Sequence, residues 1–269
     1  MPTIAIIGRK GGSGKSTLAS NLAAYFALHN MPITLGDLDN QQSMRVWLTR
    51  RPSAAPAIGS WVADAATLTR PPAGAQNLVL DTPGGLTGLA LAKTVMLSDA
   101  ILIPICGSVF DRESASDCWA ELRQHPRVKS KRCIVAAVGM RLDARTHAEM
   151  ITRDWAASVQ LDYITSLRTT QLYVRAVENG LSIFDMPLAV SEADREQWRP
   201  IIRWIGEKLY HLRDDGTMVA KIAQGIPSKL PANAVPLPQN RHVLGKVEPA
   251  PVKEDTGVVK FLGSLLKRR

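Results

Sequence analysis

Residues 10–17 read Lys-Gly-Gly-Ser-Gly-Lys-Ser-Thr and directly follow the apolar run at residues 3–8. A strand-like segment thus enters a glycine-rich turn, and the turn opens onto a helix-like segment. Glycines let backbone N–H groups close around phosphate oxygens, and the start of a helix offers its positive end. The stretch predicts a phosphate-binding loop that is formed by Gly11, Gly12, Ser13, Gly14, Lys15, Ser16 and Thr17.

The loop departs from the usual pattern G-x-x-x-x-G-K-[ST]. Arg9 stands where the first glycine belongs, and a second lysine, Lys10, lies five residues before Lys15. In loops of this kind the lysine at the place of Lys15 reaches the β- and γ-phosphates, and the hydroxyl at the place of Ser16 coordinates Mg²⁺. A nucleotide with Mg²⁺ is therefore the expected ligand.

The chain is long enough for one full α/β domain and an additional segment. It has 269 residues, of which 45% are apolar and 21% charged, as in a globular protein. Its net charge of +9 suggests a polyanionic partner, either DNA or an acidic membrane surface. The three cysteines have no metal or disulfide spacing and are expected to be reduced core thiols. With no basic leader and no long apolar run, we expect a cytoplasmic protein.

Strand-like and helix-like runs alternate up to about residue 212. The expected strands are 3–8, 33–36, 77–81, 100–105, 133–139 and 161–164. The expected helices are 16–29, 86–96, 114–125, 145–157, 171–179 and 194–212. Such alternation indicates an α/β fold with a doubly wound, mostly parallel sheet that helices cover on both faces. Ligands of these folds bind at the carboxyl ends of the strands.

The composition changes near residue 214. Frequent prolines and little periodicity indicate a Pro-rich flexible linker over 214–256, so we expect the P-loop domain to span 1–213. Residues 257–269 predict a basic amphipathic C-terminal helix, with apolar residues on one face from 258 onward. Such a helix suits an anionic membrane surface. Docking on its own domain or on a partner protein, or no ordered role, are the alternatives.

Three aspartates follow predicted strands. Asp37 and Asp39 come at the end of the second strand, and Asp81 ends the third in the string Asp-Thr-Pro-Gly-Gly. An aspartate after a buried strand of a phosphate-loop protein holds Mg²⁺ directly or through water. A single one often only caps the following turn or helix. Three of them behind a phosphate loop favour a nucleotide site.

Together these segments resemble the ParA/MinD family of positioning ATPases. Residues 10–17 are similar to the deviant Walker A motif of that family, and residues 37–41 and 81–84 look like its second and third motifs. Residues 168–185 resemble the region before the late helices of small, plasmid-type ParA proteins. The resemblance covers roughly residues 1–212.

The resemblance implies a mechanism in which two ATP-bound subunits face each other as a homodimer. Lys10 would reach the phosphates of the partner subunit, Lys15 would hold the nucleotide of its own subunit, and Asp39 would position the attacking water. The alternative for Lys10 is an ordinary solvated lysine. Nothing in the motifs looks like an arginine finger acting within its own subunit. Slow hydrolysis is therefore expected, accelerated by a small ParB-like or adaptor protein.

The resemblance also implies ligands for the cofactor. Asp37 and Asp81 would serve the metal and the nucleotide-sensing switch, with Ser16 as a further metal ligand. Pro104 would lie near the adenine, although the second proline that close relatives often carry is missing. Residues 139–141, Gly-Met-Arg, replace the usual asparagine after the fifth strand. The motifs therefore support the adenine contacts less well than the phosphate contacts.

DNA binding in this family is sequence-independent and depends on lysines and arginines that contact phosphates. One candidate group is a basic run without acidic residues, made of Arg123, Arg127, Lys129, Lys131 and Arg132. A second group comprises Arg141, Arg145, Arg168 and Arg175. A run of charges is otherwise only a solvated face.

Three functions remain to be compared. The leading interpretation is a nucleoid-associated, ParA-like ATPase that segregates or positions DNA or another large cargo through ATP-gated, nonspecific DNA binding. The second is a MinD-like ATPase that associates with the inner membrane through residues 258–269. The third is a metabolic phosphate-loop enzyme. A nitrogenase-iron-protein-like enzyme lacks suitably placed cysteines here, and a dethiobiotin-synthase-like enzyme lacks a visible substrate site.

Overall fold

The structure is a computed structural model that describes residues 1–68, 70–143, 146–212 and 218–220. The amphipathic helix expected at 257–269, and the linker expected at 214–256 except for residues 218–220, lie outside the described residues.

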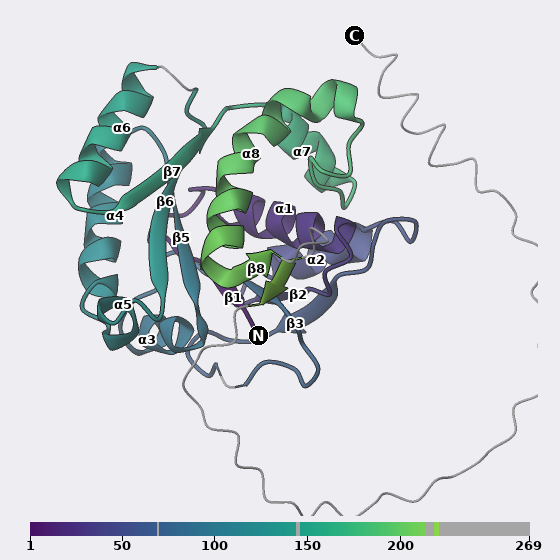
Figure 1. Cartoon of the computed structure of the whole chain (residues 1–269), viewed down its shortest axis with the longest axis horizontal. Coiled ribbons are helices and arrows are strands. Elements are labelled where there is room, and N and C mark those ends of the chain that lie inside the picture. The colour runs from purple at the N-terminus through teal and green to yellow at the C-terminus, as the bar shows by residue number, and fades with distance from the viewer. Residues whose placement is uncertain (69, 144–145, 213–217, 221–269) are drawn as a thin grey trace, which may run out of the picture. The chain divides into compact units, whose positions relative to one another are not determined.

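A parallel sheet of seven strands forms the centre of the fold (Figure 1). Its strands are β1 (Thr3–Ile6), β2 (Thr34–Asp37), β3 (Gly59–Val62), β4 (Leu78–Asp81), β5 (Ala100–Ile105), β6 (Ile134–Met140) and β7 (Asp162–Leu167). They follow the order β3-β2-β4-β1-β5-β6-β7, and every pairing is parallel. The predicted α/β fold is confirmed, and the sheet is wholly rather than mostly parallel.

Helices cover both faces of the sheet. They are α1 (Lys15–Leu28), α2 (Ser43–Arg50), α3 (Gly88–Leu97), α4 (Val109–Leu122), α5 (Pro126–Lys129), α6 (His147–Ser158), α7 (Gln171–Glu178) and α8 (Leu188–Leu209). In Figure 1, α3, α4 and α6 lie on one side and α1, α2, α7 and α8 on the other. A short antiparallel pair, β8 (Tyr210–Leu212) and β9 (Met218–Ala220), follows α8.

The central strand β1 is buried on both faces. Ile4 and Ile6 belong to one hydrophobic core, which also contains side chains of α1 and α8. Ala5 and the following Ile7 belong to the other core, together with side chains of α3 and α4. Because β1 lies between β4 and β5, the loop after β1 sits where the winding of the chain changes direction, which is the usual ligand position in such sheets.

The strand β3 and the helix α2 were not expected from the sequence. The strand β3 lies at the edge of the sheet and three of its four residues are exposed, so no buried apolar run marks it. The helix α2 buries only Met44 and Trp47. A third difference is α8, which starts at Leu188 instead of residue 194 and continues through Pro200.

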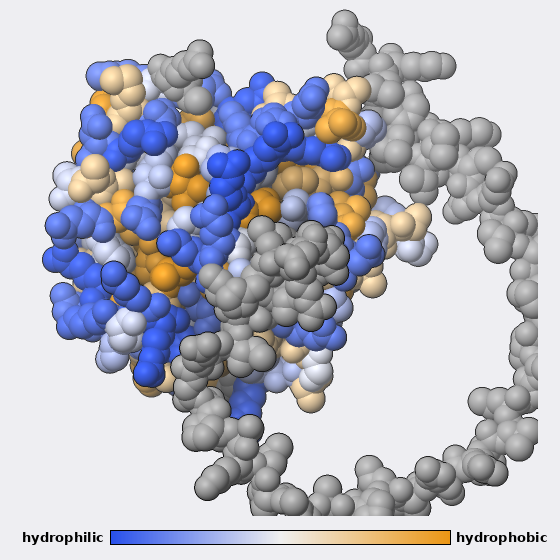
Figure 2. All heavy atoms as spheres, in the orientation of Figure 1, coloured by the Kyte–Doolittle hydropathy of each residue, from blue (hydrophilic) through white to orange (hydrophobic). Residues whose placement is uncertain are grey.

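The surface over α8 is largely hydrophilic. A band of hydrophilic residues follows this helix across the face shown in Figure 2. Among the residues that the structure describes, no helix combines the length and the apolar character that crossing a membrane requires. The three cysteines, Cys106, Cys118 and Cys133, are buried and free, as expected.

Candidate nucleotide-binding site

The predicted phosphate loop forms the turn between β1 and α1. Gly12 and Gly14 have φ angles of 69° and 103°, in the left-handed region that favours glycine. A Cβ on Gly14 would lie 2.6 Å from Cε of Met140, so a side chain at this position would have to displace the end of Met140. Gly14 is the N-cap of α1 and no side chain caps the helix. The first N–H groups of α1 are therefore available to an anion.

The structure brings Lys15, Ser16 and Asp81 together. Nζ of Lys15 donates a hydrogen bond of 3.2 Å to the carbonyl oxygen of Lys10. Oγ of Ser16 donates a hydrogen bond of 2.7 Å to Oδ2 of Asp81 at the end of β4. Burial lowers the pKa of Lys15, an effect that Asp81 and Asp39 partly offset. The lysine is thus held inside its own loop, beside the aspartate.

Asp81 has the properties of a metal ligand. It is buried, and Oδ1 has no hydrogen-bond partner among the described residues. Burial raises its pKa to about 7, although the hydrogen bond from Ser16 lowers it. Mg²⁺ prefers oxygen ligands and would supply the positive charge that this carboxylate lacks. Ser16 and Asp81, two of the three predicted metal ligands, therefore fit the ion.

Asp37, the third predicted metal ligand, caps a helix. Its Oδ2 accepts hydrogen bonds from the backbone N–H groups of Met44 and Arg45, at 2.9 and 3.1 Å, in the first turn of α2. Its Oδ1 accepts from the N–H of Asp39 at 3.2 Å. The capping interpretation of a strand-end aspartate thus holds for Asp37, and its metal role stays a prediction.

Asp39 lies at the edge of the site. It is half-buried, its Oδ1 accepts from the N–H of Gln41 at 3.0 Å, and its charge acts on Lys15. Its carboxylate is free of the helix N–H groups that engage Asp37. The predicted role in positioning water is compatible with this placement and stays a prediction.

Lys10 points away from its own loop. Its Nζ lies 2.6 Å from Oδ1 of Asp111, and the Lys10 side chain is 45% exposed whereas that of Asp111 is 9% exposed. Asp111 also forms a capping box with Ser108 at the start of α4. Burial would raise the pKa of Asp111, but the hydrogen bonds from Lys10 and Ser108 lower it. Lys10 is therefore paired in this structure, and its role toward a partner subunit stays a prediction.

Arg9, which replaces the first glycine of the usual motif, anchors the loop to the neighbouring helices. Its guanidinium pairs with the carboxylate of Glu121 on α4. The other oxygen of Glu121 accepts a hydrogen bond of 2.7 Å from the N–H of Gly88 at the start of α3. The departure from the motif thus has a structural reason.

Pro104 does not lie open to a nucleotide. It is buried within β5, and its ring atoms are 3.7 Å from where a Cβ on Gly8 would lie. The proline thus packs beneath the loop, and the predicted adenine contact finds no support in its position.

Arg141 is a residue of the site that we grouped with the DNA candidates. Its Nη2 donates a hydrogen bond of 2.8 Å to the carbonyl oxygen of Gly12 and lies 3.0 Å from Sγ of Cys106. No motif signals this contact, because Arg141 follows β6 and is far from the loop in sequence. The only sequence signal was that residues 139–141 replace the asparagine of relatives.

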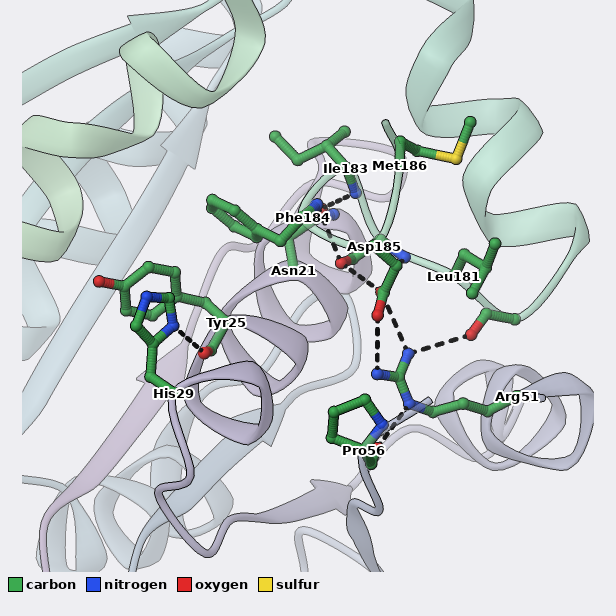
Figure 3. Close-up of polar contacts among 12 residues, drawn as sticks. Asn21, Tyr25, His29, Arg51, Pro56, Leu181, Ile183, Phe184, Asp185 and Met186 are labelled. Atoms are coloured by element: carbon green, nitrogen blue, oxygen red, sulfur yellow. Dashed lines mark hydrogen bonds and ion pairs between the residues drawn. The ribbon is translucent and has the colours of Figure 1, made fainter. Parts of the chain in front are cut away.

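The segment that resembles plasmid-type ParA proteins ends in a turn fixed on α1 and α2 (Figure 3). Arg51 forms an ion pair of 3.0 Å with Asp185, and both side chains are buried. A Cβ on Gly180, whose φ is 66°, would lie 2.3 Å from the carbonyl carbon of Arg50. These residues of the motif therefore have a packing role.

The same turn is connected to the phosphate loop. Oδ1 of Asn21 accepts a hydrogen bond of 2.9 Å from the N–H of Ile183, as Figure 3 shows. Nδ2 of Asn21 donates a hydrogen bond of 2.8 Å to the carbonyl oxygen of Thr17. One asparagine of α1 thus joins the nucleotide loop to the turn before α8.

The predicted DNA-binding residues lie at two ends of the sheet. Arg175 is exposed on α7, after the carboxyl end of β7. Arg168 is 40% exposed and pairs at 2.8 Å with Asp194, whose side chain is 1% exposed. The run at 123–132 precedes β6, at the opposite end from the phosphate loop, and its Arg127 pairs with Asp99. Arg145 lies outside the described residues.

Comparison with known proteins agrees with this geometry. The family described as the CobQ/CobB/MinD/ParA nucleotide binding domain matches residues 4–183. The chain belongs to this family. Maintenance of carboxysome distribution protein A from Gloeobacter kilaueensis is a relative of this nucleotide-binding domain, 35% identical over 109 residues. That match covers 38% of this chain and 47% of the relative, so it spans less than half of each.

Solved structures of ParA/MinD-type proteins share the fold. The apo McdA structure from Cyanothece superposes with a TM-score of 0.58 at 16% identity, covering 75% of this chain and 99% of that one. A plasmid partition protein from Borrelia burgdorferi bound to AMPPNP has a TM-score of 0.57 at 14% identity, covering 76% of this chain and 99% of that one. The family resemblance read from the sequence is confirmed.

Proposed function

We propose that this chain is a ParA-type ATPase that dimerises on ATP and segregates or positions DNA or another large cargo. The single observation that carries the proposal is the placement of Lys10. Family membership alone does not separate a positioning ATPase from a metabolic enzyme, because the family also includes CobQ and CobB. The second lysine of the loop supports the choice.

The two lysines of the loop are placed for different tasks. Lys15 is buried and bonded within its own loop, next to Asp81. Lys10 is half-exposed on the outside of the loop, and its ion pair with Asp111 is accessible to solvent. Asp111 is largely buried, but its carboxylate keeps the hydrogen bonds from Ser108 if Lys10 leaves it. Lys10 could therefore exchange Asp111 for the phosphates of a second subunit.

Hydrolysis would use the groups on the inner side of the site. Lys15 and the first N–H groups of α1 would bind the phosphates, and Ser16 and Asp81 would hold Mg²⁺, which would supply positive charge beside the phosphates. Asp39 orients the attacking water. Slow hydrolysis that a small ParB-like or adaptor protein accelerates is part of the proposal.

DNA binding that depends on ATP needs a surface near the face where the subunits meet. Arg175 lies at the loop end of the sheet, whereas the run at 123–132 lies at the other end. Dimerisation would place two copies of a surface at the loop end side by side, whereas it would leave a surface at the far end unchanged. Arg175 is therefore the better candidate, and a nucleoid location in the cytoplasm follows.

The cargo is proposed by analogy with the relatives. One relative is named for carboxysome distribution and one solved neighbour is a plasmid partition protein. Both names describe the placement of a large object in a cell. The MinD-like alternative, membrane association through residues 258–269, rests on the sequence pattern of the tail.

Binding assays on the full chain test the proposal. Gel shift on nonspecific DNA and pelleting with anionic liposomes are run with Mg-ATP, with ADP, and with Mg-ATP on a chain lacking residues 252–269. We expect an ATP-dependent DNA shift that survives the deletion. Arg175→Ala should weaken it, with Arg123→Ala, at the other end of the sheet, as the matched control. Liposome binding lost on deletion would favour the MinD-like function, and neither signal would contradict both.

A further inference from the structure

Two basic side chains hold the backbone of the phosphate loop at residues 10 and 12. Lys15 donates from inside the loop to the carbonyl oxygen of Lys10, at 3.2 Å. Arg141 donates from the neighbouring strand end to the carbonyl oxygen of Gly12, at 2.8 Å. The guanidinium of Arg141 therefore contacts the backbone of the loop that is expected to bind phosphates.

The backbone at Arg141 is shaped for this contact. Its φ is 56°, in the left-handed region that a residue with a long side chain adopts only at a cost. Such residues cluster at functional sites, where the surroundings compensate the strain. The preceding residue, Met140, fills the space beside Gly14. Two consecutive residues at the end of β6 are thus fitted to the loop.

The charge of Arg141 is not neutralised by a hydrogen-bonded carboxylate among the described residues. Its partners are the Gly12 carbonyl and the Cys106 sulfur. Asp111, whose charge acts on Arg141, already bonds Lys10 and Ser108. A guanidinium has five N–H donors, and toward the residues that the structure describes Arg141 donates from Nη2. Arg141 therefore keeps both charge and donors for a ligand.

We propose that Arg141 is a further phosphate-binding residue, which contacts the phosphate chain of the nucleotide in its own subunit. This inference rests on the proposed function, since it assumes that the loop binds ATP. A planar, permanently charged fork suits phosphate oxygens. The chain thereby supplies, from the end of β6, an arginine that the loop motif itself does not contain.

Nucleotide affinity of four variants tests the proposal. Binding of ATPγS and of ADP, each with Mg²⁺, is measured by calorimetry for Arg141→Ala, Arg141→Gln and Arg141→Lys. Arg112→Ala is the matched control, because Arg112 donates a hydrogen bond of 2.9 Å to the carbonyl oxygen of Gly107 on the neighbouring loop. One charge-assisted hydrogen bond corresponds to an affinity change of about tenfold or more. We expect that loss for Ala and Gln, a smaller loss for Lys, which keeps the charge but not the planar fork, and affinity within about threefold of the unmodified chain for Arg112→Ala.

The Gln and Lys variants separate phosphate binding from support of the loop. Gln keeps a donor for the Gly12 carbonyl and removes the charge, so full affinity in Arg141→Gln would overturn the proposal. Equal affinities of Arg141→Ala and Arg112→Ala would do the same. Thermal unfolding without nucleotide shows whether each variant is folded. If the unmodified chain bound neither nucleotide, the proposed function would fail together with this inference. If the unmodified chain bound nucleotide and the Arg141 variants bound it equally well, only this inference would fail.

Discussion

The hydroxyl of Ser16 and the carboxylate of Asp81 are joined by a hydrogen bond of 2.7 Å, from two segments that lie 65 residues apart in the chain. The contact joins the phosphate loop to the end of β4. It leaves the second oxygen of a buried carboxylate without a partner among the described residues. A proton or a metal ion can fill that position, and the two compete.

Because a proton can occupy this position, the stability of the folded chain should depend on pH. Burial raises the pKa of Asp81 to about 7, so between about pH 4 and pH 7 the folded chain holds a proton that the unfolded chain releases. This contribution to stability therefore falls as pH rises through that window, by at most about 1.4 kcal/mol per pH unit. In thermal unfolding without nucleotide, the melting temperature of Asp81→Asn should rise relative to that of the unmodified chain as the pH is raised from 5 to 8. A constant difference would contradict the assignment.

The two aspartates after β2 should respond differently to replacement. Asp37→Ala removes the cap of α2 and three backbone hydrogen bonds, so we expect a loss of about 1–3 kcal/mol in urea unfolding. Asp39→Ala should cost less than about 0.5 kcal/mol. It should bind ATP normally and hydrolyse it at least tenfold more slowly, by analogy with other lost catalytic groups. Unchanged turnover in Asp39→Ala would refute its assigned role.

Replacing Arg168 should lower the stability of the chain, whereas replacing Arg175 should weaken DNA binding. Arg168→Ala leaves the buried carboxylate of Asp194 unpaired, so we expect a loss of about 2 kcal/mol in stability. Replacing Asp194 by Asn in the same chain should recover part of it. Arg175→Ala should be stable and weaken DNA binding, with a salt slope reduced by about 1. The reverse pattern in unfolding and titration experiments would show that the roles are exchanged.

Two glycines with similar backbone angles provide a test of the turn before α8. Gly180 has φ 66° with the backbone of Arg50 2.3 Å from its virtual Cβ, whereas Gly74 has φ 84° with nothing within 4 Å. Gly74→Ala should therefore cost about 1 kcal/mol, from backbone strain alone. Gly180→Ala should cost about 3 kcal/mol or more, because strain and overlap add. Equal melting temperatures would contradict the packing role of Gly180.

The sequence predicted those parts of the fold that buried apolar periodicity marks. The inner strands and the loop at 10–17 belong to this group, since their residues are buried or glycine. The strand β3 was missed because an exposed edge carries no such pattern. Asp37 and Asp81 both follow a buried strand and look alike in sequence. Their environments differ because Asp37 accepts hydrogen bonds from the first turn of α2, a helix that the sequence did not predict.

The sequence motifs could not predict which residues from distant segments come into contact. Lys10 meets Asp111 across about a hundred residues, and Arg141 meets Gly12 over a still longer separation. Both pairs exist because β1, β5 and β6 are neighbours in the sheet, so that the residues after their carboxyl ends converge. A charged residue after a strand end gives no sign of which neighbouring loop it will contact.

The central claim is that ATP joins two subunits through Lys10. Light scattering of the Asp39→Ala chain, which should retain ATP, measures this most directly when compared with the Lys10→Ala/Asp39→Ala chain. The account predicts twice the monomer mass with Mg-ATP for the first chain and monomer mass for the second, both with ATP bound. A monomer in the first case, or a dimer in both, would contradict it.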